Sequence, residues 1–207
     1  MSDNAELLWG ARFKAAPAAS LTALSRSPDY YFALAPYDLA GCRAHARELA
    51  RGDLLSSEEL HTMLAAIDAL DADYRAGNLH PIAADEDVHT FIERALTERL
   101  GPLGGKLRAG RSRNDQTAND LRLYLRDNGR KVVSALLALQ QSLVEQAAQH
   151  TESVAPGSTH LQQAQPIVFG HQRPAHALSL APALYRNHDR DPRISLFPLG
   201  PVPISLP

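Results

Sequence analysis

The amino-acid sequence predicts an all-α protein, with an N-terminal helical domain followed by the first long helices of a central helical bundle. Apolar residues recur at three- and four-residue steps in several consecutive segments, which is the spacing of one helix face. Capping and turn residues stand between these segments. No period of about twenty to fifty residues repeats, which excludes solenoids and propellers. A succession of helices is therefore the expected architecture.

The composition is that of a chain that can close a hydrophobic core, because 44% of its 207 residues are hydrophobic and 21% are charged. Its formal net charge of -2 gives no overall attraction to nucleic acid or to an anionic membrane. An acidic N-terminus and the lack of any run of about eighteen apolar residues argue against secretion and membrane spanning. Cys42 is the single cysteine, which excludes an intrachain disulfide and fits a reducing compartment. We expect a cytoplasmic protein with no nucleic-acid or membrane partner.

Two amphipathic segments predict a helical hairpin at residues 35–50 and 56–77. Gly52 and its neighbours stop the first helix. Ser56 and Glu59 have the spacing of a capping box, in which each side chain accepts a hydrogen bond from the other residue's backbone N–H. The apolar stripes are Leu39, Cys42, Ala46 and Leu49 in the first helix and Leu60, Leu64, Ile67 and Leu70 in the second.

A third, shorter helix is expected at residues 88–96. The carboxylates of residues 85–87 (DED) precede it, where the positive end of a helix dipole favours negative charge. Gly101 and Pro102 end this helix.

The longest expected helix runs from residue 113 to residue 150. Its narrow stripe consists of Leu121, Leu125, Val132, Leu136, Leu139 and Leu143. Such a rod extends more than about 50 Å, so a compact domain of this size cannot cover its stripe. Partner helices or partner subunits must cover it, which predicts an oligomer. A further helix is expected to begin at Pro166, since proline suits the first helical position.

The end of the chain is rich in proline. Seven of the 14 prolines follow residue 173, and each would destabilise a helix interior by about 3 kcal/mol. Residues 186–207 are therefore expected to lack regular structure. The predicted organisation is an N-terminal helical domain at residues 1–111, the start of a central bundle at 112–185 and a divergent proline-rich tail at 186–207.

A basic segment, GRSRNDQ at residues 110–116, opens the longest expected helix. A helix N-terminus offers unpaired backbone donors, and arginine side chains match the geometry of a carboxylate. The basic residues that crowd this end are Lys106, Arg108, Arg111 and Arg113. They indicate a site for an anion with more than one carboxylate. The alternative is an ordinary cap formed by Ser112 and Asp115 beside solvated basic side chains, and local chemistry taken alone favours that cap.

Two further polar segments could carry chemistry. Residues 157–166 (GSTHLQQAQP) contain His160, which can exchange a proton near neutral pH among hydroxyl and amide groups that can hold an oxygen-rich ligand. The alternative is a polar interhelical loop. His89 and Glu93 could share a metal ion, but they present too few ligands, so a helix cap is the better account of residues 85–89. No metal site is predicted.

Four motifs together carry a family resemblance. They are LWGARF at residues 8–13, DEDVH at 85–89, GRSRNDQ at 110–116 and PGSTHLQQAQP at 156–166, in the order found in argininosuccinate lyases. The sequence resembles this family, which belongs to the aspartase/fumarase superfamily, over residues 7 to about 180. The resemblance implies a homotetramer of long packed helices, active sites assembled from three subunits, and no cofactor or metal requirement.

The resemblance also implies a reaction and the residues that perform it. Argininosuccinate is cleaved to arginine and fumarate in arginine biosynthesis and the urea cycle. Ser27, Asn114 and Thr159 match substrate contacts, and His160 matches a group that moves the proton. Arg113 and Gln162 are added as substrate-binding residues because of their donor chemistry beside those positions.

The resemblance further implies a partial enzyme. The resemblance fades after about residue 180, and the chain stops before the family's mobile loop, which carries the catalytic serine. The chain alone is therefore expected to be inactive. Two alternatives stay open. One is a sister lyase such as adenylosuccinate lyase, and the other is a non-catalytic, crystallin-like or oligomerisation protein.

Overall fold

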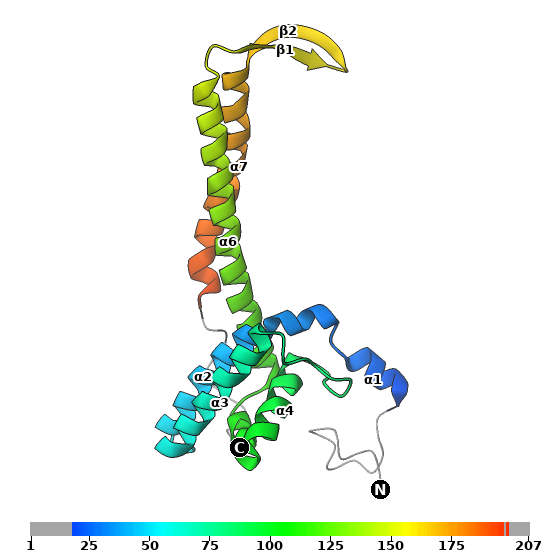
Figure 1. The fold of residues 1–207 in the computed structure, drawn as a ribbon, viewed down its shortest axis with the longest axis vertical. Helices are drawn as coiled ribbons and strands as arrows, with labels where there is room; N and C mark the ends of the chain where they lie inside the picture. The colour runs from blue at the N-terminus through cyan, green and yellow to red at the C-terminus, as the bar shows by residue number, and fades with distance from the viewer. Residues whose placement is uncertain (1–17, 197, 199–207) are drawn as a thin grey trace. The chain divides into compact units, whose positions relative to one another are not determined.

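The computed structural model describes residues 18–196 and residue 198 (Figure 1). The chain forms two compact units, one up to Leu121, to which Pro198 also belongs, and one that begins at Arg122. The division falls later than the expected boundary after residue 111, because the opening of the longest helix packs with the first unit. The motif at residues 8–13 lies outside the described residues.

The first unit is built from helices, as the sequence predicts. The hairpin at residues 35–50 and 56–77, the third helix and the end of that helix at Gly101 are all confirmed. Short helical segments lie around them. The elements are α1 (Ala19–Ser25), η3 (Asp29–Leu34), α2 (Ala35–Arg51), α3 (Ser57–Arg75), α4 (Val88–Leu100), α5 (Pro102–Gly105), η4 (Lys106–Arg108) and the start of α6 (Arg113–Gln149).

Side-chain caps fix where α3 and α4 begin. The Ser56 Oγ accepts a hydrogen bond from the Glu59 backbone N–H at 3.1 Å, and the Glu59 carboxylate accepts one from the Ser56 N–H at 2.9 Å. The Asp87 carboxylate caps α4 by accepting from the Thr90 N–H at 2.6 Å. These bonds satisfy backbone donors that a helix start would otherwise leave unpaired.

The core of the first unit lies where α2, α3 and α4 meet. Phe91 of α4 contacts Phe32 edge to face, with ring centroids 6.0 Å apart. In α3 the buried position belongs to Met63, whereas Leu60 and Leu64 of the predicted stripe are half-buried at its edge. The fully buried apolar side chains include Leu39, Cys42, Met63, Ile67, Leu70, Val88, Phe91 and Leu96.

The second unit is a helical hairpin capped by a β-hairpin. The predicted long helix is confirmed as a single element, α6, whose 37 residues extend roughly 55 Å. The helix α7 (Phe169–Ile194) runs antiparallel beside it (Figure 1), and the Gln140 side chain donates a hydrogen bond to the Ala177 carbonyl at 2.7 Å. Strands β1 (Val154–Thr159) and β2 (Gln162–Val168) follow α6 and precede α7 in the sequence, and they pair with each other.

The β-hairpin corrects two expectations, since residues 157–166 were expected as a loop and a helix was expected from Pro166. Pro166 lies in β2, and α7 begins at Phe169. A two-stranded ribbon accepts proline because each strand is an edge and some backbone N–H groups need no partner. The strands are joined by His160 and Leu161, both in the left-handed region, with φ of 52° and 63°. That conformation is the one a two-residue hairpin turn requires.

The expectation that residues 186–207 lack regular structure is wrong for residues 186–194. Helix α7 continues to Ile194 through Pro174, Pro182 and Pro192. Contacts with α6 hold its end, since Arg130 binds Asp191 at 2.8 and 3.0 Å and the Arg122 side chain donates to the Leu196 carbonyl at 2.8 Å. Residues 199–207 lie outside the described residues.

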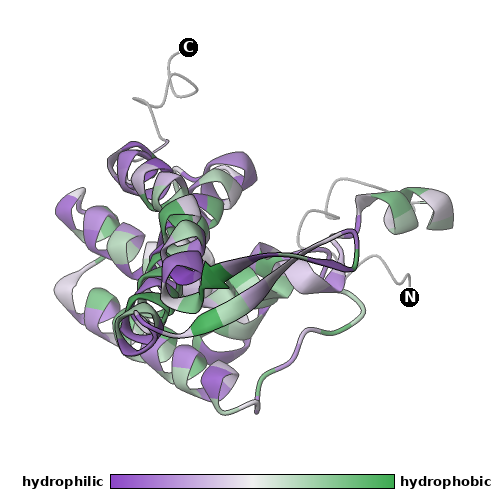
Figure 2. Ribbon diagram, turned by 90° about the horizontal axis from the view of Figure 1, so that it is seen from above, coloured by the Kyte–Doolittle hydropathy of each residue, from purple (hydrophilic) through white to green (hydrophobic). Residues whose placement is uncertain are grey.

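The second unit leaves its apolar stripe largely uncovered. Leu125, Val132 and Leu139 of α6 are 39%, 52% and 49% exposed, and Leu178 of α7 is 71% exposed. Seen from above, the helices carry both hydrophilic and hydrophobic residues (Figure 2). Among the described residues, no helix combines the length and apolar character needed to cross a membrane. The exposed stripe agrees with the expectation that further helices cover it.

Candidate functional site

The segment at residues 111–116 leads from η4 into the first turn of α6. Gly110 precedes it with φ of 69°, a left-handed conformation that glycine adopts without a steric penalty. The Ser112 Oγ accepts a hydrogen bond from the Asn114 N–H at 3.3 Å, so Ser112 caps the helix. Asn114 itself is exposed at the positive end of α6, where its side chain can reach a ligand.

The four basic residues of this region are all paired with carboxylates of the same unit. Lys106 binds Glu59 at 2.5 Å, Arg108 binds Glu93 at 3.1 Å, and Arg111 lies 3.6 Å from Asp38. Arg113 binds Glu93 at 3.1 Å and Asp87 at 3.4 Å. The alternative of an ordinary cap expected these basic side chains to be solvated, whereas each of them pairs with a carboxylate. The charge that an anionic ligand would meet is largely balanced, and the exposed side-chain amide of Asn114 remains as a donor.

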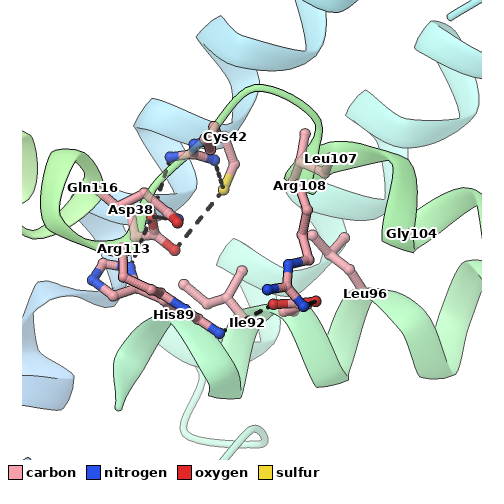
Figure 3. A pocket seen from close by; sticks show the side chains of 12 residues that line it. Asp38, Cys42, His89, Ile92, Leu96, Gly104, Leu107, Arg108, Arg113 and Gln116 are labelled. Carbon is pink, nitrogen blue, oxygen red and sulfur yellow. Dashed lines mark hydrogen bonds and ion pairs between the residues drawn. The ribbon is translucent and has the colours of Figure 1, made fainter. Parts of the chain in front are cut away.

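Beneath this segment lies a buried polar cluster centred on Asp38 of α2 (Figure 3). The Gln116 amide donates to Asp38 Oδ1 at 3.1 Å, and His89 Nδ1 of α4 lies 3.3 Å from the same oxygen. Arg111 also donates to the Cys42 sulfur at 3.2 Å. Asp38, His89 and Asp120 are 1%, 2% and 0% exposed, so these contacts form away from bulk water.

The two buried aspartates, Asp38 and Asp120, differ in protonation state. Burial raises the pKa of Asp38, but His89, Arg111 and Gln116 together outweigh it and hold the pKa below its ordinary value. Burial and the negative charge of Asp38 raise the pKa of Asp120 to about 8. At neutral pH Asp38 carries the charge and Asp120 carries a proton. Burial likewise raises the pKa of the Cys42 thiol, which keeps it protonated.

The surroundings of the cluster do not favour a metal ion. Asp38, His89 and Asp120 offer ligand atoms within 4.8 Å of one another. However, Gln116 and Arg111 already direct donors at Asp38, and a guanidinium beside the cluster opposes a cation. The pairing of His89 with Glu93 that a metal would need does not form, because Glu93 binds Arg108 and Arg113.

The predicted site residues fall into two groups, one in each unit. Ser27 is half-buried in the first unit, and its N–H donates to the Glu86 carbonyl at 2.8 Å. The next residue, Asp87, binds Arg113, so Ser27 and the opening of α6 are linked through residues 86 and 87. Asn114 follows Arg113 directly.

The second group lies at the tip of the β-hairpin. Thr159 pairs with Gln162 in the register of the strands, and His160 lies in the turn between them. All three side chains are exposed. Leu161, beside His160, is 104% exposed, so nothing in the described part of the chain encloses this tip. A surface from outside the described residues would be needed to exclude water from His160.

Sequence reasoning missed Asp38 and Asp120. A signal for Asp38 was present, because it stands four residues before Cys42 and therefore on the buried face of α2. Asp120 lies next to Leu121, one position off the predicted stripe of α6, and only the packing of α6 on the first unit buries it.

Residues 11–201 match the sequence pattern of the lyase family. The chain belongs to the lyase family. It is 62% identical over 200 residues to argininosuccinate lyase 1 of Pseudomonas fluorescens (strain Pf0-1), which covers 97% of this chain and 42% of that protein. The expected loss of resemblance after residue 180 is thus wrong, since the family match continues to residue 201.

Solved structures of other lyases share the fold. An EDDS lyase variant with bound fumarate has a TM-score of 0.67 and 32% identity, over 82% of this chain and 33% of that one. A fumarate lyase:delta crystallin from Brucella melitensis has a TM-score of 0.64 at 18% identity, over 82% of this chain and 44% of that one, which shows the fold alone. The all-α prediction is confirmed, and this chain of the lyase family spans less than half the length of each of these relatives.

Proposed function

We propose that this chain is part of an argininosuccinate lyase, which cleaves argininosuccinate to arginine and fumarate in arginine biosynthesis. The observation that carries the proposal is the 62% identity to an argininosuccinate lyase over 97% of the chain. Two of the four motifs that carry the resemblance, at residues 110–116 and 156–166, lie at an exposed helix start and at an exposed hairpin tip. Both positions suit contact with a small-molecule substrate.

The reaction is an elimination. A proton leaves the carbon beside one succinyl carboxylate, the electron pair forms the double bond of fumarate, and the carbon–nitrogen bond breaks to release arginine. The difficult species is the carbanion, whose charge spreads into the neighbouring carboxylate. Fixed donors stabilise such a charge, and each is worth about 2.7 to 4 kcal/mol in known oxyanion sites.

The predicted residues divide this work. Ser27, Arg113 and Asn114 of the first unit and Thr159 and Gln162 of the hairpin supply hydrogen-bond donors for the substrate. His160 moves the proton, because an imidazole nitrogen can accept and donate a proton as a general base and acid. Neither step calls on a metal ion or an organic cofactor in this proposal.

The full enzyme is proposed to be a cytoplasmic homotetramer without nucleic-acid or membrane partners. The exposed stripe of α6 and α7 supports the association of subunits, since apolar side chains such as Val132 and Leu178 are 52% and 71% exposed. The uncovered hairpin tip supports active sites that combine residues of different chains.

The second candidate is a sister lyase that releases fumarate from another succinyl compound, such as adenylosuccinate. The likeness to an EDDS lyase variant with bound fumarate at 32% identity supports a common elimination with a different amine. A non-catalytic role of the scaffold is the third reading, and the test below addresses both.

The test supplies the missing length in trans. The chain is purified and mixed with the C-terminal remainder of the Pseudomonas fluorescens relative, and fumarate is followed by ultraviolet absorbance. We expect turnover of argininosuccinate by the mixture, none by the chain alone, and no turnover of adenylosuccinate. Preference for adenylosuccinate would favour the sister lyase, and a mixture that associates but turns over neither substrate would favour the non-catalytic role.

A further inference from the structure

The segment at residues 111–116 is fastened to α2 at both of its ends. At one end, the Arg111 guanidinium lies 3.6 Å from Asp38 Oδ1 and donates to the Cys42 sulfur at 3.2 Å. At the other end, the Gln116 amide donates to the same Asp38 oxygen at 3.1 Å. One carboxylate therefore receives both ends of the segment that carries Ser112, Arg113 and Asn114.

Asp38 is the only ionised acceptor in this buried cluster. The groups that face it are Cys42 from α2, His89 from α4, Arg111 from the segment, and Gln116 and Asp120 from α6. Asp120 is 0% exposed, and neither of its carboxyl oxygens has a hydrogen-bond partner in the described residues. Without the Asp38 charge, Arg111 would lose its nearest carboxylate in a site that water does not reach.

We propose that Asp38 is a positioning residue, whose buried carboxylate holds both ends of the 111–116 segment and thereby fixes Asn114 for the substrate. The consequence for catalysis rests on the proposed function, whereas the anchoring itself does not. Asn114 is exposed, and its own N–H bonds only to Ser112 within the same segment. Its place relative to the rest of the first unit is thus set by the anchored ends.

Hydrogen exchange of individual backbone amides tests the anchoring directly. The Arg111 N–H donates to the Arg108 carbonyl at 3.1 Å, and the Gln116 N–H donates to the Ser112 carbonyl at 3.2 Å. The Asn114 N–H donates to the Ser112 Oγ at 3.3 Å. The exchange rates of these three amides therefore report how well ordered the segment is. In Asp38→Asn, which keeps the side-chain shape and removes the charge, we expect these amides to exchange about tenfold faster, because hydrogen bonds to a charged group are lost. Amides of α3 should change less.

Asp71→Asn is the matched control. Asp71 also pairs with an arginine of α2, Arg43, at 3.0 Å, but it ties α2 to α3 and does not contact the segment. The two variants are compared at the same interval below their own melting temperatures. Faster exchange at residues 111–116 in Asp38→Asn alone supports the proposal, and equal exchange in both variants overturns it.

Two further measurements keep the proposal falsifiable. If Asp38→Asn does not fold, Gln116→Ala removes one anchor at a half-buried position, and the Asn114 amide should still exchange faster than in Asp71→Asn; no difference overturns the proposal. In the mixture with the C-terminal remainder, Asp38→Asn should raise KM more than it lowers kcat, since a substrate contact is displaced. If the wild-type mixture is inactive, the proposed function fails while the exchange data still decide the role of Asp38.

Discussion

Asp120 and Asp38 are fully buried next to each other, and two carboxyl groups so placed cannot both ionise at neutral pH. The hydrogen bond from Gln116 and the nearby His89 and Arg111 side chains select Asp38 as the charged member. The polar cluster therefore avoids two adjacent negative charges only while Asp120 keeps its proton. This is a property of the packing of α2, α4 and α6, because an aspartate in water is ionised at this pH.

Stability should consequently fall with rising pH through Asp120. Its pKa is about 8 in the folded chain against an ordinary value of 3.8, so between these pH values the folded state binds a proton that the unfolded state releases. The free energy of unfolding then decreases as pH rises, by up to about 1.4 kcal/mol per pH unit for one proton. Urea denaturation at pH 5 and pH 8 should show this loss in the wild-type chain and a smaller loss in Asp120→Asn. If the free energy of unfolding fell equally between pH 5 and pH 8 in the two proteins, Asp120 would already be ionised.

A second prediction at this scale concerns the start of α3. Ser56→Ala removes the side-chain acceptor of the capping box, whose bonds measure 3.1 and 2.9 Å. We expect a loss of about 1 kcal/mol in the free energy of unfolding, because one backbone N–H loses its partner. Ser57→Ala, one residue further on and inside the helix, is the control and should change stability far less.

At the level of elements, local signals predicted most of the helices. The starts of α3 and α4 follow from Ser56 and Asp87, whose caps are short-range and visible in the sequence. The continuity of α6 follows from its stripe. The hairpin of β1 and β2 was not visible, because its strands include many polar residues, a glycine and two prolines, and its turn lacks the usual glycine or asparagine.

Helix α7 shows why the number of prolines led to a wrong prediction for residues 186–194. Each proline weakens the helix locally, but Arg130 reaches Asp191 from α6 across 61 positions of sequence, and no local pattern reveals that pair. The candidate site also combines residues that the sequence predicts with a residue that only the packing reveals. The motifs that hold Asn114 and His160 were recognisable, whereas the buried partner Asp38 needed the packing of α2 against α6.

The end of α7 should depend on its ion pair with α6. Asp191→Asn keeps the side-chain shape and removes the charge that binds Arg130 at 2.8 and 3.0 Å. Because Pro192 already interrupts the helix locally, we expect faster amide exchange at residues 190–196 than in the wild-type chain. Asp189→Asn, whose partner Arg193 lies on the same helix, is the control and should leave most of that protection in place. Equal exchange in the two variants would mean that the pair with α6 does not hold the end.

At the scale of the whole molecule, the residues of the proposed site come from both units, and the proposal assigns part of the site to each. The first unit holds Asn114 at an exposed helix start, and the second presents His160 on an uncovered hairpin tip. The exposed apolar stripe of α6 and α7 supports the proposal that other subunits pack there. Association is therefore the step that brings the substrate contacts and the proton-moving histidine together in the proposed enzyme.

Mixing two inactive variants tests that claim most directly. Asn114→Ala and His160→Ala are each combined with the C-terminal remainder of the Pseudomonas fluorescens relative, and fumarate release from argininosuccinate is recorded for each variant and for an equal mixture. We expect each variant alone to be inactive and the mixture to regain part of the wild-type rate, because some sites then combine intact residues from different chains. A mixture that stays inactive while the wild-type chain turns over, or full activity in either variant alone, would contradict the account.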